Sequence, residues 1–192
     1  MKQVQGTAYN ISSDIVGRIT FGKVNPFSRS KHILVSKSQK KTWGYAATIC
    51  QECNAIAKNA LCIVNDISTF KEGDIVVINS DGKISFVYEI KSSHNSIMAT
   101  FRCNHRCIMC PQPPVSKEQD RTDFNLNLIS LYDKSTKEVG ITGGEPTLIG
   151  DNLFKLIKGI HKRLPGAAIS ILSNGVKFSD KSYARKLALC HH

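Results

Sequence analysis

Hydrophobic and polar positions follow different patterns in the two halves of this chain, and the change falls near residue 95. Before it, apolar residues gather in short β-branched and aromatic runs at residues 14–22, 32–36 and 73–91. Such runs predict short strands. The last run is interrupted by Asp81-Gly82, a pair typical of a tight hairpin turn. We therefore predict a small β-rich domain over residues 1–95.

From residue 96 on, strand-like and helix-like segments alternate. Three strands and three helices are predicted, over residues 96–101, 123–134, 137–142, 151–164, 167–173 and 179–189. Asp151 and Ser179 are the predicted caps of the last two helices, and Pro165-Gly166 ends the middle one. This order predicts a parallel sheet with right-handed crossovers, hence an α/β core domain over residues 96–192.

Three polar motifs follow the three predicted strands. "RCNHRCIMC" occupies residues 102–110, "GGEP" residues 143–146 and "SNG" residues 173–175. The carboxyl ends of parallel strands meet at one edge of a sheet, where α/β proteins bind their ligands. The three motifs are therefore predicted to lie on one rim.

Composition and length describe an ordinary globular protein. The chain has 192 residues, of which 41% are hydrophobic and 21% charged. It contains no apolar run long enough to span a membrane, and its first residues lack the apolar core of a secretory signal. We expect a cytoplasmic protein without a membrane partner. Thiols stay reduced there, so seven cysteines favour buried thiols or a metal site over disulfides.

Positive charge is spread over the whole chain, whose formal net charge is +11. The densest basic run, residues 28–41, contains Arg29, Lys31, Lys37, Lys40 and Lys41 and no acid. Such a run could contact nucleic acid or an acidic peptide. A strand edge or loop kept soluble by lysines is the interpretation we favour, and we do not expect a nucleic-acid partner.

Cys103, Cys107 and Cys110 crowd three thiols into one loop. Thiolates are soft ligands, suited to zinc or to an iron-sulfur cluster. A closed zinc site needs a fourth ligand, for which His105 is a candidate. Structural zinc sites usually draw ligand pairs from two segments, whereas three thiolates on a four-iron cubane leave one iron open to a small molecule.

"CNHRCIMC", followed by a strand and "GGEP", resembles the cluster loop and glycine motif of radical S-adenosylmethionine (SAM) enzymes. The resemblance implies that Cys103, Cys107 and Cys110 hold a [4Fe-4S] cluster whose fourth iron binds SAM. Gly143 and Gly144 would let the backbone approach the cofactor, and Glu145 would accept hydrogen bonds from its amino group. SAM cleavage would yield a 5'-deoxyadenosyl radical.

Three further residues are expected near SAM by the same resemblance. The family often has an aromatic residue before the third cysteine, where this chain has Met109, a thioether that can pack on a purine. Ser173 or Asn174 would help line the SAM pocket. An ordinary Asn-Gly turn is the alternative for that last motif.

The stretch "SSHNSIMATFRCNHRCIMCPQPP" resembles the HxsC-type maturases of His-Xaa-Ser peptide systems, as does the β-rich leader. This implies a precursor peptide with His-Xaa-Ser repeats as substrate, and an electron donor such as flavodoxin or ferredoxin. The family core is a partial barrel of about six βα units, of which three are predicted here. We therefore expect a truncated core: a fragment, a frameshifted product or half of a split enzyme.

Two alternatives to a peptide maturase stay open. The chain could be another radical SAM enzyme, of the activating or small-molecule type, or a cluster-binding remnant without catalysis. The remaining cysteines are Cys50, Cys53, Cys62 and Cys190. An auxiliary metal site at the first three is conceivable, but Cys50 and Cys53 also fit one helical face with Ala46, Ala57 and Ala60, where we predict packed free thiols. His94 and His105 are predicted to form local hydrogen bonds.

Overall fold

The computed structural model describes residues 2–38, 43–53, 59–111, 114–115, 118 and 120–191. The chain divides into two compact units, Met1–Ser92 and Ser93–His192, which are described separately. The division falls three residues before the predicted change at residue 95. Asn95 already belongs to the first strand of the second unit.

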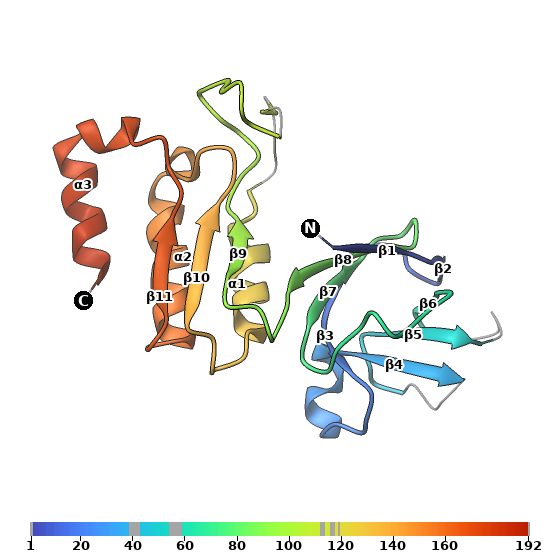
Figure 1. Cartoon of the computed structure of the whole chain (residues 1–192). Coiled ribbons are helices and arrows are strands. Elements are labelled where there is room, and N and C mark those ends of the chain that lie inside the picture. The colour runs from blue at the N-terminus through green and yellow to red at the C-terminus, as the bar shows by residue number, and fades with distance from the viewer. Residues whose placement is uncertain are drawn as a thin grey trace. The chain divides into compact units, whose positions relative to one another are not determined.

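The first unit is built on one eight-stranded mixed sheet (Figure 1). Its strands are β1 (Gln3–Gln5), β2 (Thr7–Tyr9), β3 (Ile15–Thr20), β4 (His32–Ser38), β5 (Ala47–Glu52), β6 (Leu61–Ile63), β7 (Ile75–Ile78) and β8 (Lys83–Tyr88). They lie in the order β1-β8-β7-β3-β4-β5-β6-β2. Strands β3 to β6 pair in parallel, and the other neighbours are antiparallel. The predicted β-rich character of this half of the chain is confirmed.

The predicted hairpin around Asp81-Gly82 is present between β7 and β8, where Ile78 pairs with Ile84. Gly82 has a φ of 84°, a left-handed conformation that most side chains avoid. A Cβ at this position would also lie 2.2 Å from the carbonyl oxygen of Gly6. Glycine is therefore required both by the turn and by the neighbouring chain.

The structure corrects the helical face predicted around Cys50. Residues 47–52 form strand β5, which lies between β4 and β6. Residues 54–58 lie outside the described part of the chain. Residues 47–50 of this strand are all buried, and a strand paired on both sides and buried on both faces does not show the alternation of a surface strand.

The basic run of residues 28–41 crosses two elements. Arg29 and Lys31 lie in the 3₁₀ helix η1 (Pro26–Lys31), and Lys37 lies in β4. Lys40 and Lys41 fall outside the described residues. Because β4 is an inner strand of the sheet, the described part of this run does not lie on a sheet edge, and the alternative of a loop is not tested by the described residues.

The second unit alternates strands and helices, as predicted. Its elements are β9 (Asn95–Met98), α1 (Thr122–Leu131), β10 (Glu138–Thr142), α2 (Asp151–Arg163), β11 (Ala168–Ile171) and α3 (Lys181–Ala188), with short 3₁₀ turns η2 (Pro146–Ile149), η3 (Val176–Ser179) and η4 (Leu189–His191). The strands pair in parallel in the order β11-β10-β9. Helices α1 and α2 lie side by side against this sheet (Figure 1). The second unit is thus α/β, with three βα repeats.

Both predicted helix caps are wrong by one residue. Gly150 precedes α2, and Asp151 is its first residue, where a carboxylate still favours the positive end of the helix dipole. Asp180, not Ser179, caps α3: its side chain accepts hydrogen bonds from the main-chain N–H groups of Ser182 and Tyr183. Ser179 instead ends η3.

The second unit has an apolar core, and its parallel register sets where the strands end. Val139 and Ile141 of β10 are fully buried, as are Leu153, Leu156 and Ile160 of α2. The register places Ile141 opposite Ile97 of β9 and Ile171 of β11. The three strands therefore end at one edge, and the loops that follow them start from a common rim.

Candidate functional site

The three predicted motifs lie on this rim. The cysteine loop follows β9, the segment "GGEP" follows β10 and "SNG" follows β11. Two main-chain hydrogen bonds join the first two motifs. The Gly144 N–H donates to the Thr100 carbonyl oxygen at 2.8 Å, and the Glu145 N–H donates to that of Arg102 at 2.8 Å. The start of the cysteine loop is thereby attached to the end of β10.

The cysteine loop itself turns toward solvent. Cys107 and Cys110 are exposed, Cys103 is half-buried, and none of the three is in a disulfide. The Cys110 N–H donates to the Cys107 carbonyl oxygen at 3.0 Å, which closes a turn over the last part of the loop. Met109 is 91% exposed, so its thioether is accessible to a ligand.

The ligand types in this loop fit an iron-sulfur cluster, since three reduced thiols come from one accessible segment. Among the described residues, however, no three cysteine, histidine or acidic side chains lie close enough together to hold a metal ion. The loop therefore provides the three thiol ligands, but their sulfur atoms do not lie close enough together to form a metal site.

Gly143 and Gly144 form the closest contact between the motifs. A Cβ at Gly144 would lie 2.1 Å from the Arg102 carbonyl oxygen and 3.0 Å from the Cys103 Cβ. A Cβ at Gly143 would lie 2.4 Å from the Thr100 carbonyl oxygen. Any larger residue would push the cysteine loop away, so both glycines are needed to hold the loop against β10.

Glu145 is only 1% exposed, yet its carboxylate accepts four hydrogen bonds. Oε1 accepts from the Thr147 N–H (3.0 Å), the Thr147 hydroxyl (2.6 Å) and the Ser173 hydroxyl (2.8 Å), and Oε2 accepts from the Asn174 N–H (2.7 Å). Burial by itself would raise the pKa of Glu145, but these donors outweigh it and the pKa is lowered. The carboxylate is thus held charged between the ends of β10 and β11.

The motif "SNG" forms the local turn that was one of the two expectations for it. The Gly175 N–H donates to the Ser173 hydroxyl and the Val176 N–H to Asn174 Oδ1, which are the bonds of a local turn. The same two residues also bind the Glu145 carboxylate. Ser173 and Asn174 therefore lie beside the predicted cofactor residues, with their polar groups partly used by the protein itself.

Two residues of this rim were missed by the sequence analysis. Thr147 provides two of the four donors to Glu145, and its position two residues after the glutamate was the available signal. Asn104 lies inside the cysteine loop, and its side-chain oxygen accepts a hydrogen bond from Asn174 Nδ2 at 2.8 Å. No local pattern indicates that partner, because the two residues are far apart in the sequence.

The other cysteines differ from those of the loop. Cys50 and Cys53 form a disulfide, with their Cα atoms 5.9 Å apart, which corrects the prediction of free packed thiols for this pair. Cys62 is a free thiol that is fully buried, and burial raises its pKa to about 11. Cys190 is also free and buried. The prediction of a packed thiol is confirmed for Cys62.

Both histidines form polar contacts. His94 Nδ1 lies 3.3 Å from Glu138 Oε2, and His105 Nδ1 lies 3.2 Å from Asn104 Oδ1. The contact of His105 with the preceding residue agrees with the predicted local hydrogen bond, whereas His94 pairs with a residue of another strand, β10.

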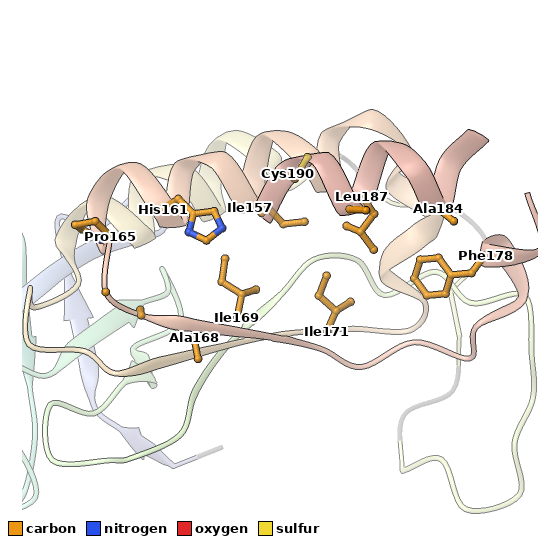
Figure 2. A pocket seen from close by; sticks show the side chains of 13 residues that line it. Ile157, His161, Pro165, Ala168, Ile169, Ile171, Phe178, Ala184, Leu187 and Cys190 are labelled. Atoms are coloured by element: carbon orange, nitrogen blue, oxygen red, sulfur yellow. The ribbon is translucent and has the colours of Figure 1, made fainter. Parts of the chain in front are cut away.

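An apolar groove of about 1020 Å³ opens beside β11 (Figure 2). Ile169 and Ile171 form its floor, and Ile157 of α2 and Leu187 of α3 face them. None of the predicted cofactor residues lines it. The groove is therefore separate from the rim of polar motifs.

Residues 97–191 match the family described as Radical SAM superfamily. This segment begins in β9 and includes the three motifs and all three helices of the second unit. The second unit of the chain is therefore a radical SAM domain, and such domains use a [4Fe-4S] cluster and S-adenosylmethionine.

Three curated proteins that are similar to this chain are all GTP 3',8-cyclases. The chain is 31% identical over 106 residues to a GTP 3',8-cyclase of Nautilia profundicola, which covers 52% of this chain and 32% of the relative. It is 30% identical over 107 residues to that of Desulforamulus reducens, covering 53% and 33%, and 34% identical over 98 residues to that of Petrotoga mobilis, covering 48% and 30%. The chain thus spans about a third of the length of these relatives.

These relatives do not support the narrower resemblance to HxsC-type maturases. They favour the alternative of another radical SAM type. No solved structure matches the chain. No helix in the described part of the chain combines the length and the apolar character needed to cross a membrane.

Proposed function

We propose that this chain carries the SAM-cleaving site of a radical SAM enzyme, with Cys103, Cys107 and Cys110 as the ligands of the [4Fe-4S] cluster. The observation that carries the proposal is the attachment of a loop with three cysteines, none of them in a disulfide, to Gly144 and Glu145 at one sheet edge. When bound and reduced, the cluster supplies the electron that cleaves SAM to methionine and a 5'-deoxyadenosyl radical. A flavodoxin or ferredoxin is the proposed electron donor.

The protein's own residues would bind and orient the cofactor. Gly143 and Gly144 would hold the cysteine loop against β10 beside the cofactor, and the exposed Met109 is available to an adenine ring. The role we propose for Glu145 differs from the one that the resemblance implied, which was to accept hydrogen bonds from the amino group of SAM. Because its carboxylate already accepts four hydrogen bonds, we propose that it chiefly fixes the segments after β10 and β11 beside SAM.

For the substrate we propose a small molecule of the purine nucleotide class, because the curated relatives are GTP 3',8-cyclases. A ribosomally made peptide of a His-Xaa-Ser system is the second candidate, favoured by the stretch around "CNHRCIMCPQPP" and by the β-rich first unit. The proposed barrel of about six βα units would need repeats beyond the three described here.

The test begins with anaerobic reconstitution of the native protein. We expect about four irons and four sulfides per chain, and 5'-deoxyadenosine after addition of SAM and reductant. The Cys107→Ala variant should form no 5'-deoxyadenosine. Stoichiometric zinc without sulfide in the wild-type protein would contradict the proposal.

The substrate is tested by adding GTP or a His-Xaa-Ser repeat peptide to the same reaction. Faster 5'-deoxyadenosine release with GTP, together with a new nucleotide product by mass spectrometry, supports the first candidate. A mass change in the peptide alone supports the second.

A further inference from the structure

A side-chain contact joins the interior of the cysteine loop to the end of β11. Asn174 Nδ2 donates to Asn104 Oδ1 at 2.8 Å and lies 3.1 Å from His105 Nδ1. Asn104 and Asn174 are 70 positions apart in the sequence. Asn104 lies between the first two cysteines of the loop, so this contact acts on the segment that would surround the metal.

The orientation of the Asn174 amide is determined by a second bond. Its Oδ1 accepts from the Val176 N–H at 3.1 Å, so Nδ2 is the group turned toward Asn104. The main-chain N–H of Asn174 also donates to Glu145 Oε2 at 2.7 Å. One residue therefore contacts both the buried carboxylate after β10 and the loop that bears the cysteines.

We propose that Asn174 is a positioning residue. Its contacts with Asn104 and with the Glu145 carboxylate hold the interior of the cysteine loop in place and so limit the opening of the loop. The inference rests on the proposed function, which makes this loop the holder of the cluster. The loop needs such an anchor because Cys107, Met109 and Cys110 are all exposed. Loop opening is the step that lets iron escape, so loss of the anchor should speed that step.

The experiment measures the rate at which an iron chelator removes iron from the anaerobically reconstituted protein. Asn104→Ala and Asn174→Ala should each release iron about fivefold faster than the wild type, the effect expected from one lost hydrogen bond. The double variant should be no faster than the faster single one, because both changes remove the same contact. Iron content before the challenge should be unchanged, since all three cysteines remain.

Two further variants separate positioning from general stability. Asn152→Ala is the matched control, since Asn152 Nδ2 donates to Asp120 Oδ2 at 2.7 Å in an equally exposed bridge that does not touch the cysteine loop. It should release iron at the wild-type rate. Asn104→Asp keeps an oxygen that can accept from Asn174 Nδ2, so it should restore slow release. Thermal unfolding of each variant tests whether the fold is retained.

Rates for Asn104→Ala equal to those of Asn152→Ala would overturn the inference, as would effects that multiply in the double variant. Either result leaves the cluster assignment standing. A wild-type protein that takes up no iron and sulfide would instead remove the proposed function, and this inference with it.

Discussion

The two units differ in the exposure of Cys62 and of the three loop cysteines, whereas each unit buries a carboxylate. In the first unit, Cys62 is buried, and Asp74 is a fully buried carboxylate. In the second unit, the three loop cysteines reach solvent, whereas the buried carboxylate is Glu145. The comparison of the two carboxylates shows that donors, rather than exposure, decide whether a buried charge is favourable.

Asp74 has far fewer partners than Glu145. Its Oδ1 accepts from the Ile90 N–H at 3.0 Å, and its buried Oδ2 has no hydrogen-bond partner among the described residues. Burial raises the pKa of Asp74, and the nearby charge of Glu89 adds to the effect. In Glu145, four donors reverse the effect of burial. The negative charge of Asp74 is therefore unfavourable in the first unit, whereas that of Glu145 is stabilised by its donors in the second.

The largest contrast is expected between thiols of the two units. Cys107→Ala removes an exposed thiol of the proposed cluster and should reduce iron from about four per chain to near zero. Cys62→Ala removes a buried thiol of the first unit and should leave iron unchanged, at a cost of about 1 kcal/mol in unfolding free energy. Iron analysis and urea unfolding measure the two effects. A Cys107 variant that kept its iron would abolish the distinction.

The second prediction exchanges each buried carboxylate for its amide. Glu145→Gln turns an N–H₂ group toward donors that now need an acceptor and should cost about 2–3 kcal/mol. Asp74→Asn keeps the acceptor for the Ile90 N–H and removes an ill-matched charge, so unfolding free energy should stay equal or rise. Urea unfolding at pH 7 gives both values. Equal losses in the two variants would show that the difference in donors has no energetic weight.

A third prediction tests the close contact of the glycine motif. Gly144→Ala places a methyl group against the Arg102 carbonyl oxygen and should cost about 2 kcal/mol while weakening iron retention. Gly166→Ala is the matched control, since nothing lies within 4 Å of the added carbon there. Its unfolding free energy should change by less than about 0.5 kcal/mol. Similar costs at the two positions would argue against a tight contact at the loop.

The smallest effects concern pH. The lowered pKa of Glu145 contributes stability that is present above its unfolded-state pKa and is lost as pH falls through the folded value. The raised pKa of Asp74 acts in the opposite sense. Its contribution to the free energy of unfolding is lost as pH rises through the pKa that Asp74 has in the folded protein. The stability gap between wild type and Glu145→Gln should therefore narrow toward acid pH. The advantage of Asp74→Asn over wild type should grow as pH rises from about 4 to 7.

Unfolding curves at several pH values measure both trends. A gap for Glu145→Gln that widened in acid would contradict the assigned sign. For Asp74→Asn, an advantage that did not depend on pH would show that the carboxylate is not the cause.

Local pattern predicted the order of elements well and their exact ends less well. The alternating strands and helices after residue 95 were correctly predicted, because each buries one apolar face with its own period. Both helix caps were misplaced by one residue: Gly150 rather than Asp151 precedes α2, and Asp180 rather than its polar neighbour Ser179 caps α3. Strand β5 was taken for a helical face because a strand buried on both sides loses its alternation.

The sequence by itself determined the chemistry that is available: three cysteines in one loop, two adjacent glycines and a glutamate, each directly after a strand. Only the tertiary structure decided what those groups contact. Glu145 meets Ser173 and Asn174, and Asn104 meets Asn174, because parallel pairing of β9, β10 and β11 brings three loops to one edge. Such contacts join residues distant along the chain, and local periodicity carries no information about distant partners.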